Sequence, residues 1–397
     1  MTSTRSHPLL SVVVPTRDRQ QFASSLLYGI QAFDTLDLEV IIQDNSEASS
    51  LERTISDLDD CRIRYFYNAE PLTMHQNFER AIDNASGEYV CAIGDDDGIN
   101  VPVAINSLLR ARSNGVDALL TEIYSYSWPG IKHRVWGEIG GPIFSVRCFP
   151  GLARQSLDPE SELRKLFNRG TVGGLGLLPR VYQGFVSRAC LLALKERAGT
   201  YFPGASPDMA NAVGLVPFVK NMLFEPEFAL ISGHSPNSGG GQGASGRHHG
   251  ELEDIVHLPS NTVSTWDPAI PRFWSGTTVY AQSAIEATRA VGISERYNLN
   301  YLRIYTACLL YQPPQYHRHI QRSLRTSDKR WSDLWLPFFF EYSLMISRRI
   351  TTFIRNFSLY CLNIKRIGHF NNMHEIMIHL TEKDSTQSAN GNTDENQ

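Results

Sequence analysis

The first 126 residues alternate short apolar runs with stretches of helical periodicity, and this alternation constrains the fold more than any other feature. The apolar runs are rich in β-branched residues and lack polar alternation, which is typical of strands buried on both faces of a sheet. Strand and helix in strict alternation with short connections predict a doubly wound, mostly parallel α/β sheet. We expect its strands at 9–14, 38–43, 63–68, 89–93 and 117–126, with helices between them.

Polar residues follow several of these strands at the point where each strand ends. Arg17 and Asp18 follow the first strand, Asp44 follows the second, and three consecutive aspartates at 95–97 follow the fourth. Ligands of open α/β sheets bind outside the carboxyl ends of the strands. The sequence therefore predicts a ligand site where these polar groups meet.

The three aspartates, Asp95, Asp96 and Asp97, need a positive partner. Adjacent carboxylates raise one another's pKa unless a positive charge lies between them, and no Arg or Lys is close in sequence. A Mg²⁺ or Mn²⁺ ion, held by one or two carboxylates and the phosphates of a substrate, would supply that charge. The spacing does not fit a calcium-binding EF-hand loop. We predict a Mn²⁺ or Mg²⁺ site here, with a solvated acidic turn as the structural alternative.

Composition narrows the class of protein. A hydrophobic share of 42% with 20% charged residues is ordinary for a globular chain with a sizeable core, and the net charge of −4 argues against nucleic acid as the main partner. The six cysteines show no CxxC pair, which indicates a reducing compartment. No window approaches the roughly 18 uncharged apolar residues that a membrane span needs. We expect a cytoplasmic protein.

Four segments in a fixed order carry a family resemblance: SVVVPTRDR (11–19), EVIIQDNSE (39–47), AIDNASGEYVCAIGDDDG (81–98) and a later Pro207-Asp208. Together they resemble the family 2 glycosyltransferases of the GT-A fold. The resemblance is dense over the first 100 residues and loose from about 127 to 240. It implies a Rossmann-like α/β domain that binds a nucleoside-diphosphate sugar.

The resemblance also implies roles for individual residues. Asp44 corresponds to the family's acidic residue that holds the base or ribose, and Asp95 to Asp97 occupy its DxD region. The family more often has D-x-D-D there, and this chain has Gly94 in the first acidic place. The implied nucleotide-sugar-binding residues are Pro15, Thr16, Arg17, Asp18, Asp44, Asn77, Asp95 and Asp96, and the implied metal ligands are Asp96, Asp97 and His234.

Asp208 matches the position of the family's catalytic base, although Pro207 replaces the usual Glu before it. Displacement of a nucleoside diphosphate builds negative charge on the leaving group, which a divalent cation stabilises. The acceptor hydroxyl needs a carboxylate within hydrogen-bond reach to take its proton. The resemblance thus implies an inverting transfer from a UDP- or dTDP-sugar to a saccharide or lipid-linked acceptor, in surface polysaccharide or glycoconjugate biosynthesis.

Composition shifts along the chain predict its organisation. We expect a GT-A domain over 1–250, with a nucleotide-sugar-binding half at 1–126 and an acceptor and catalytic half at 127–250 rich in Gly, Pro and aromatic residues. Helical periodicity predicts a helical region over 251–380, and the polar tail 381–397 has no apolar anchor and is expected to be disordered.

The C-terminal region carries a local positive charge. Between residues 316 and 370, Lys and Arg number 10 against 3 Asp and Glu, interleaved with aromatic residues. Packed helices with a solvated basic face are one interpretation. The other is a peripheral contact of 331–370 with an anionic membrane, where lipid-linked acceptors are found.

Two other functions are compatible with parts of the sequence. D-x-D-G after an apolar strand is also the nucleophile motif of haloacid-dehalogenase-type phosphatases, but here other strands precede it and Ile99 follows Gly98. The second alternative is a protein that binds nucleotide sugars without turning them over. If the wild type neither hydrolyses nor transfers any nucleotide sugar, the binding protein is favoured, whereas a full transfer rate in Asp208→Asn would show that Asp208 is not the base.

Overall fold

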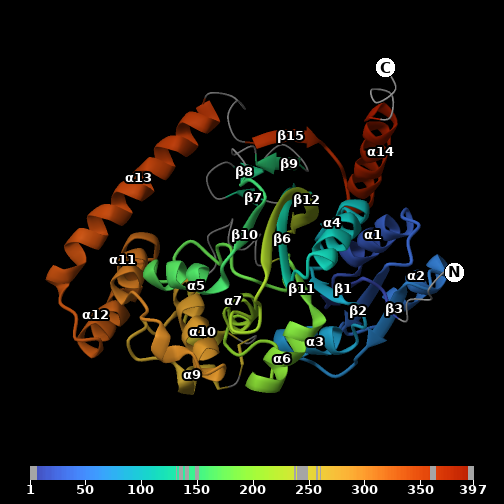
Figure 1. Cartoon of the computed structure of the whole chain (residues 1–397). Helices are drawn as coiled ribbons and strands as arrows, with labels where there is room; N and C mark the ends of the chain where they lie inside the picture. The colour runs from blue at the N-terminus through green and yellow to red at the C-terminus, as the bar shows by residue number, and fades with distance from the viewer. Residues whose placement is uncertain are drawn as a thin grey trace.

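Figure 1 shows the computed structural model, in which helices surround one large sheet. The structure describes residues 7–130, 132–133, 137–138, 143–147, 152–236, 238, 249–255, 258–259, 261–357 and 364–391. Most of the Gly/Ser-rich segment 232–250 and part of the basic segment 331–370 lie outside the described residues.

The sheet is mostly parallel, as predicted. Its main path runs β10-β12-β6-β11-β4-β1-β2-β3, with parallel pairing of β1 to β2 and β4, of β2 to β3 and of β6 to β12. The short strand β11 lies antiparallel between β4 and β6. The strands of this path are β1 (Leu10–Thr16), β2 (Leu38–Asp44), β3 (Ile63–Tyr67), β4 (Tyr89–Ala92), β6 (Ala118–Ser127), β10 (Gln155–Leu157), β11 (Phe185–Ser187) and β12 (Met222–His234).

Shorter strands extend the sheet or form separate pairs. Strand β5 (Gly98–Ile99) pairs with β12, and β9 (Ile143–Arg147) joins β6 to β15 (Ile364–Gly368). Two small ribbons lie apart from it: β7 (Lys132–His133) with β8 (Gly137–Glu138), and β13 (His249–Gly250) with β14 (Trp274–Ser275).

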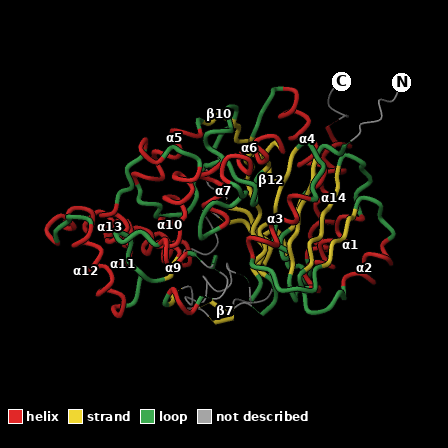
Figure 2. Tube along the Cα trace, turned by 90° about the horizontal axis from the view of Figure 1, so that it is seen from below, coloured by secondary structure: helices red, strands yellow, loops and turns green. Residues whose placement is uncertain are grey.

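Strand β1 shows why the sheet needs helices on both sides. Val12 and Val14 pack into one hydrophobic core and Val13 into the other, because successive side chains of a strand point to opposite faces. Helices α1, α4 and α14 contribute to the first core, and α3, α5, α6, α7 and α10 to the second. Figures 1 and 2 show the helices on both faces of the sheet.

The helices of the first 215 residues are α1 (Gln20–Gln31), α2 (Leu51–Leu58), α3 (Met74–Asp83), α4 (Val101–Ser113), α5 (Pro159–Asn168), α6 (Arg188–Ala198) and α7 (Pro207–Gly214). Those that follow are α9 (Thr262–Thr265), α10 (Gly276–Ala290), α11 (Tyr301–Tyr311), α12 (His317–Thr326), α13 (Trp335–Phe357) and α14 (Met373–Gly391).

The C-terminal segment differs from the expectation in two respects. Its strand β15 joins the main sheet and α14 packs on α1, so it returns to the N-terminal half of the molecule (Figure 1). Helix α14 also continues to Gly391, whereas disorder was expected from residue 381. Its first turns supply the apolar anchor, because Met373, Ile376, Met377 and Leu380 are buried with a helical spacing.

Candidate active site

The carboxyl ends of β1, β4 and β12 meet, and the side chains that follow them form a buried polar cluster. Thr16 at the end of β1 donates a hydrogen bond to Asp95 Oδ2 at 2.8 Å. Beyond β12, the backbone N–H of Ser235 donates to Asp96 Oδ2 at 3.1 Å. Asp95, Asp96 and Asp97 are all buried. Of the predicted convergence of polar groups at this edge, the structure shows the meeting of the ends of β1 and β4, and it adds the end of β12.

Arg19 is a positive partner that the sequence analysis did not assign. Its Nη1 lies 3.1 Å from Asp95 Oδ1 and its Nη2 lies 2.9 Å from Asp96 Oδ2. The same Nη2 donates to Ser235 Oγ at 2.6 Å. One guanidinium therefore bridges two buried carboxylates and links the ends of three strands. The sequence contained a signal for this ion pair, because Arg19 ends the PTRDR segment that follows β1, and β1 lies beside β4 in the sheet.

Aromatic rings hold Arg19 in this position. Its guanidinium carbon lies 5.0 Å from the centre of the Phe22 ring, which meets the Trp128 ring edge-on at 4.7 Å. Trp128 in turn donates its indole N–H to the backbone oxygen of Asp96 at 2.9 Å. A planar guanidinium stacks well on an aromatic face, which pre-organises it for ion pairing.

Asp97 is occupied by donors from its own turn and from two other segments. Its Oδ2 accepts hydrogen bonds from Gly94 N, Tyr182 Oη and Gln183 Nε2 at 2.9–3.1 Å, and its Oδ1 accepts one from Gly233 N at 2.7 Å. A carboxylate has about four lone-pair positions, so these donors fill it. Burial, and next the charge of Asp96, raise the pKa of Asp97. This carboxylate fixes the turn in place.

Gly233 is required by the close approach of β12 to this turn. A Cβ atom at Gly233 would overlap the backbone oxygen of Asp96 and lie 3.0 Å from Trp128 Nε1. Any larger residue would push the strand away from the aspartates and break the hydrogen bond from Gly233 N to Asp97.

Asp95 and Asp96 have more room for a cation than Asp97. Asp95 Oδ1 is buried and accepts no hydrogen bond from the described residues, although Arg19 lies beside it. Burial raises the pKa of Asp95 to about 7, while the charge of Arg19 opposes that rise. Within the described ranges, no group of three or more His, Cys, Asp or Glu is arranged as metal ligands. A cation here would depend on oxygen atoms from a substrate as well.

His234, the third predicted metal ligand, is the last residue of β12. It pairs with Ser127 of β6, and its backbone oxygen accepts a hydrogen bond from Trp128 N at 3.0 Å. Its chain neighbour Ser235 contacts Asp96 directly. The structure places His234 at the same sheet edge as the aspartates, and its role as a ligand stays a prediction.

The predicted nucleotide-contacting loops after β1 and β2 are joined to each other. Asp18 has a left-handed backbone, φ 54°, donates its N–H to Ser46 Oγ at 2.7 Å and accepts from Glu47 N at 2.9 Å. Arg17 and Asp18 are exposed and Pro15 is half-buried. The exposed side chains of Arg17 and Asp18 lie at the outer rim of this edge of the sheet, where a ligand would reach them.

Asp44 and Asn77 are turned inward. Asp44 Oδ1 accepts from Ser46 N and Ser46 Oγ at 2.9 and 2.5 Å, and its Oδ2 accepts from Tyr65 Oη at 3.0 Å. Asn77 on α3 donates to the backbone oxygens of Thr16 and Gln43 at 3.3 and 3.4 Å. Both side chains support the ends of β1 and β2, and their contact with a nucleotide remains a prediction.

Asp208 lies in the first turn of α7, and this helix is anchored beside the aspartates. Asn211, one turn further on, accepts a hydrogen bond from Val181 N at 2.9 Å. Val181 belongs to the segment that runs along the end of β4 and places Tyr182 and Gln183 on Asp97. Asp208 raises the pKa of Tyr182 further, after burial and Asp97, so Tyr182 is a shared neighbour of Asp97 and Asp208.

The surroundings of Asp208 suit a proton acceptor. Burial raises the pKa of Asp208 to about 6, and the charge of Arg180 opposes that rise. Burial lowers the pKa of Arg180 to about 10, while the charge of Asp208 opposes that fall. Asp208 also contributes, after burial, to the raised pKa of Tyr280 on α10. A carboxylate with a pKa of about 6, whose charge interacts with an arginine and two phenols, has the properties expected of a general base.

Helix α10 joins this neighbourhood although it lies in the segment expected to be a separate helical region. Ser206 N donates to Ser283 Oγ at 2.7 Å and Ala205 N donates to Glu286 Oε2 at 3.0 Å. Segments on both sides of the predicted boundary at residue 250 therefore pack together around Asp208.

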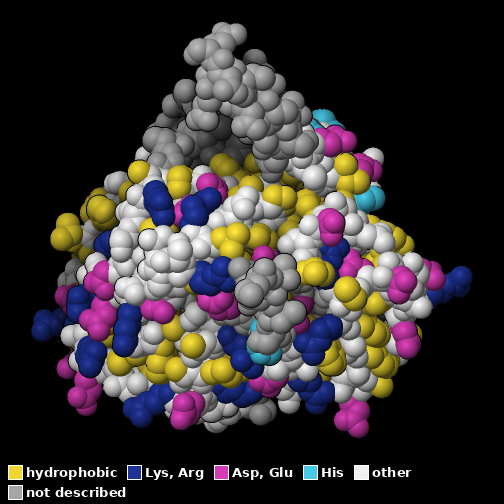
Figure 3. Space-filling view, turned by 45° about the vertical axis from the view of Figure 1, so that its right-hand side comes forward, with side chains coloured by type: hydrophobic (Ala, Val, Ile, Leu, Met, Phe, Trp, Pro, Cys, Tyr) yellow, Lys and Arg dark blue, Asp and Glu magenta, His cyan; other side chains and the backbone are white. Residues whose placement is uncertain are grey.

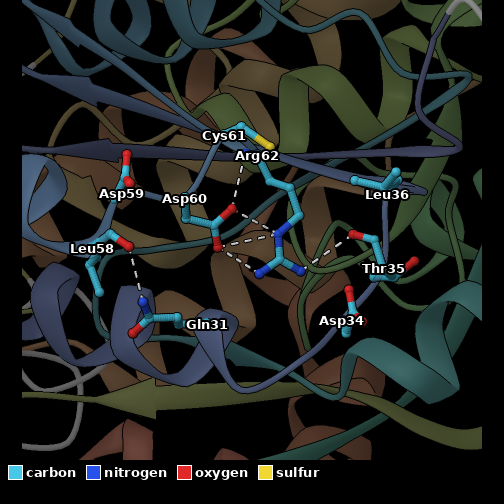
Figure 4. A pocket seen from close by; sticks show the side chains of 9 residues that line it. All are labelled: Gln31, Asp34, Thr35, Leu36, Leu58, Asp59, Asp60, Cys61 and Arg62. Atoms are coloured by element: carbon cyan, nitrogen blue, oxygen red, sulfur yellow. Dashed lines mark hydrogen bonds and ion pairs between the residues drawn. The ribbon is translucent and has the colours of Figure 1, made fainter.

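The pocket in Figure 4 is located elsewhere. Its lining residues follow α1 and α2 and precede β2 and β3, at the amino ends of the strands. Arg62 in it is engaged by Asp60, with Nε at 2.9 Å from Oδ1 and Nη2 at 2.6 Å from Oδ2, and by Ile30 O at 3.3 Å. The hydrogen bonds from Arg62 lower the pKa of Asp60. This pair anchors two loops and is remote from the aspartates.

Comparisons with known proteins match the segment of the chain that contains the three aspartates. Residues 11–139 match the model of the family described as "Glycosyl transferase family 2". A β-1,3-glucosyltransferase of Campylobacter jejuni, named for GalNAc(5)-diNAcBac-PP-undecaprenol, is 34% identical over 111 residues, 27% of this chain and 36% of that protein. The putative colanic acid biosynthesis glycosyl transferase WcaA of Escherichia coli is 34% identical over 95 residues, 23% of this chain and 34% of that protein.

Solved structures resemble the chain over a larger part of its length. TarS 1–349 of S. aureus, in complex with UDP-GlcNAc, is 13% identical, with a TM-score of 0.47, and the match covers 79% of each chain. A mannosyltransferase of Pyrobaculum calidifontis, in complex with GDP-Man and Mn²⁺, is 12% identical with a TM-score of 0.39, over 84% of this chain and 85% of that one.

The chain spans about a third of the length of the curated relatives it matches. The match of residues 11–139 includes β1 to β6, and with them Thr16, Arg19 and the three aspartates. The mostly parallel α/β sheet found in the structure agrees with the GT-A fold that the resemblance implied. Residues 11–139 of this chain are therefore similar to glycosyl transferase family 2.

Proposed function

We propose that the chain is an inverting glycosyltransferase that moves a sugar from a nucleoside-diphosphate donor, UDP- or dTDP-linked, to a hydroxyl of a saccharide or lipid-linked acceptor. The observation that carries the proposal is the family match at 11–139 over strands whose carboxyl ends gather Thr16, Arg19 and the aspartates. The Campylobacter relative, by its name, acts on an undecaprenol-linked saccharide, which supports a role in glycoconjugate biosynthesis.

Binding of the donor is assigned to the edge formed by the loops after β1, β2 and β4. Arg17 and Asp18 at the exposed rim would contact the nucleotide, and Arg19 would lie near its diphosphate once the buried carboxylates are shared with a cation. Guanidinium groups match phosphate oxygens with two parallel hydrogen bonds, so Arg19 suits this position.

A Mn²⁺ or Mg²⁺ ion fits Asp96 and Asp95 better than Asp97. Asp95 Oδ1 is ion-paired with Arg19 but accepts no hydrogen bond from the part of the chain that the structure describes, while both oxygens of Asp97 already accept hydrogen bonds. Such ions are commonly held by one or two carboxylates plus substrate phosphates. When bound, the metal would stabilise the charge of the departing diphosphate. His234 stays a candidate ligand by its place at the end of β12.

Asp208 would take the proton of the acceptor hydroxyl. Its pKa of about 6 leaves it ionised at neutral pH yet basic enough to accept a proton during attack. Arg180 and Tyr280 would orient it, since both interact with its charge. Direct displacement by the hydroxyl, without a covalent enzyme intermediate, inverts the anomeric centre.

The test is a transfer assay with candidate donors and a panel of saccharide and polyprenyl-diphosphate-linked acceptors, followed by NMR of the anomeric proton in the product. We expect a product whose anomeric configuration is opposite to that of the donor. Retention of configuration would contradict the single displacement. Donor binding without any transfer would favour the alternative, a nucleotide-sugar-binding protein.

A further inference from the structure

Helix α13 exposes a row of large apolar side chains. Trp335, Phe339, Tyr342 and Ile346 follow a spacing of four, three and four residues, which places them on one side of the helix. We call these four residues the aromatic stripe. Between 37% and 66% of each is exposed, and beside the stripe Leu336 is 81% and Phe340 55% exposed. Isolated exposed apolar residues are ordinary, but a continuous row of this size marks an interaction surface.

Another side of α13 is fixed to the protein. Glu341 is buried and forms an ion pair with Arg303 of α11. Met345 on α13 and Leu334 just before it are also buried. Since a buried ion pair and two apolar residues hold this side, the aromatic stripe cannot rotate into the core. Figures 1 and 2 show α13 at the margin of the molecule, next to α11 and α12 and away from the sheet.

Exposed basic residues directly precede the aromatic stripe along the chain. The exposed residues of α12 and the following turn include Arg318, Arg322, Arg325, Lys329 and Arg330. Asp328 and Asp333 are the exposed acidic residues between Arg318 and Ser347, so the exposed charge there is positive. By contrast, basic and acidic side chains are interspersed on the face shown in Figure 3.

We propose that the aromatic stripe of α13 lies in the interfacial layer of a membrane rich in anionic lipids, with the basic residues of α12 and its turn against the headgroups. Trp and Tyr favour this layer because one end of the ring is apolar and the other is polar. Each Lys or Arg close to an anionic surface contributes about 1 kcal/mol. The helix lies along the surface, because its other side remains packed on α11.

A second copy of the chain fits this surface less well. In a two-fold dimer the aromatic stripe would meet its own copy, and the basic residues of α12 would need an acidic surface on that copy. The exposed charge between Arg318 and Ser347 is positive, so this part of a second copy does not offer one. An anionic bilayer offers an apolar layer and the complementary charge at once. Binding to the membrane does not depend on sugar transfer. If the proposed function holds, the membrane is also the surface on which a lipid-linked acceptor would be presented.

The experiment is vesicle co-sedimentation of the full chain, with phosphatidylcholine vesicles that contain or lack phosphatidylglycerol. We expect binding to the anionic vesicles that is at least 10-fold tighter than to the neutral ones. Trp335→Ser combined with Phe339→Ser is expected to weaken binding to anionic vesicles at least 10-fold. Arg318→Gln, Arg322→Gln and Arg325→Gln together remove about 3 kcal/mol, or roughly 100-fold in affinity, and weaken the salt dependence.

The matched control is Leu36→Ser combined with Leu192→Ser, which removes exposed apolar side chains elsewhere and is expected to leave binding unchanged. Far-ultraviolet circular dichroism and sedimentation velocity report folding and assembly of each variant. Equal binding by the wild type and the Trp335/Phe339 variant would overturn the proposal, and so would no binding by either. A dimer that dissociates in that variant, without vesicle binding, would assign the aromatic stripe to a second copy. None of these readouts depends on a sugar donor.

Discussion

Three adjacent carboxylates at the end of β4 are tolerated because two of them share one cation and the third accepts several hydrogen bonds. Arg19 lies between Asp95 and Asp96, whereas Asp97 accepts hydrogen bonds from Gly233, Gln183, Tyr182 and Gly94. The sequence analysis expected a metal ion as the positive partner and favoured Asp96 and Asp97 as ligands. The guanidinium is present in the fold itself, so any metal adds to Arg19 and does not replace it.

Replacing Arg19 tests this arrangement. In Arg19→Gln, two buried carboxylates lose their cation, and we expect the free energy of unfolding to fall by about 2–4 kcal/mol, less than a fully buried pair would lose because Arg19 is 25% exposed. Arg19→Lys, which keeps the charge, should lose less. Urea denaturation at neutral pH measures both.

Manganese extends the Arg19 test. A divalent cation can replace part of the lost charge, so Mn²⁺ should raise the melting temperature of Arg19→Gln more than that of the wild type. Equal unfolding free energies for the wild type and Arg19→Gln would contradict the role given to Arg19. If Mn²⁺ raises the melting temperature of the wild type and of Arg19→Gln by the same amount, this would argue against a cation at Asp95 and Asp96.

We expect the Asp208 carboxylate to serve catalysis but to lower the stability of the folded protein. Its pKa is about 6 in the folded protein against 3.8 for an ordinary aspartate, so folding favours the protonated form. The stability that comes with the protonated form is complete below pH 3.8 and is lost as the pH rises through 6. Asp208→Asn imitates that form and should be more stable than the wild type above pH 6, by up to about 3 kcal/mol.

The activity of the same variant should move in the opposite direction. Removal of a general base lowers kcat by about 100-fold or more, and the kcat/KM of the wild type should rise with pH through about 6. Stability and transfer are measured across pH 4 to 8, the window set by these two pKa values. A variant that transfers sugar at the wild-type rate would show that Asp208 is not the base.

At the scale of elements, the N-terminal half could be predicted from sequence because its signals are local. The strands expected at 9–14, 38–43 and 63–68 correspond to β1, β2 and β3, since buried parallel strands are continuous β-branched runs. The contributions of Gly233, Ser235 and Tyr182 to the site could not be predicted. They come from segments more than 80 residues away along the chain, and no local pattern marks which strand ends will meet.

Helix α14 illustrates a signal that was available. Its apolar residues repeat at a helical spacing up to Leu380, but the polar composition after residue 380 led to an expectation of disorder. The helix continues to Gly391 because the buried first turns start it, and elongation from an existing turn is favourable.

The packing of α14 on α1 gives a prediction for this element. Met377 is fully buried and fits against Gly29, where a Cβ would lie 2.5 Å from its sulfur. Met377→Ala should lower the free energy of unfolding by about 2–4 kcal/mol, because it leaves a cavity between the helices. Chemical denaturation measures this, with the exposed Leu36→Ala as a control that should change little. A loss below about 0.5 kcal/mol in Met377→Ala would mean that α14 is not part of the folded core.

For the whole molecule, the structure joins three regions around one sheet edge. The family-matched segment carries the aspartates and Arg19, α7 carries Asp208, and α10 packs behind α7 with Tyr280 near Asp208. Helices α12 and α13 carry the proposed membrane surface. None of the described helices is both long and apolar enough to cross a bilayer. We propose that the chain acts at the inner face of a membrane, with the donor taken from the cytoplasm.

The most direct test of the central claim is calorimetric titration of UDP-, dTDP-, GDP- and CMP-sugars into the wild type, with and without Mn²⁺. We expect one donor class to bind in a manganese-dependent manner. Its affinity should fall at least 10-fold in Asp96→Asn and stay unchanged in Asp208→Asn, because Asp208 is assigned to the acceptor side. If no nucleotide sugar binds the wild type with Mn²⁺ present, the proposed glycosyl transfer is contradicted.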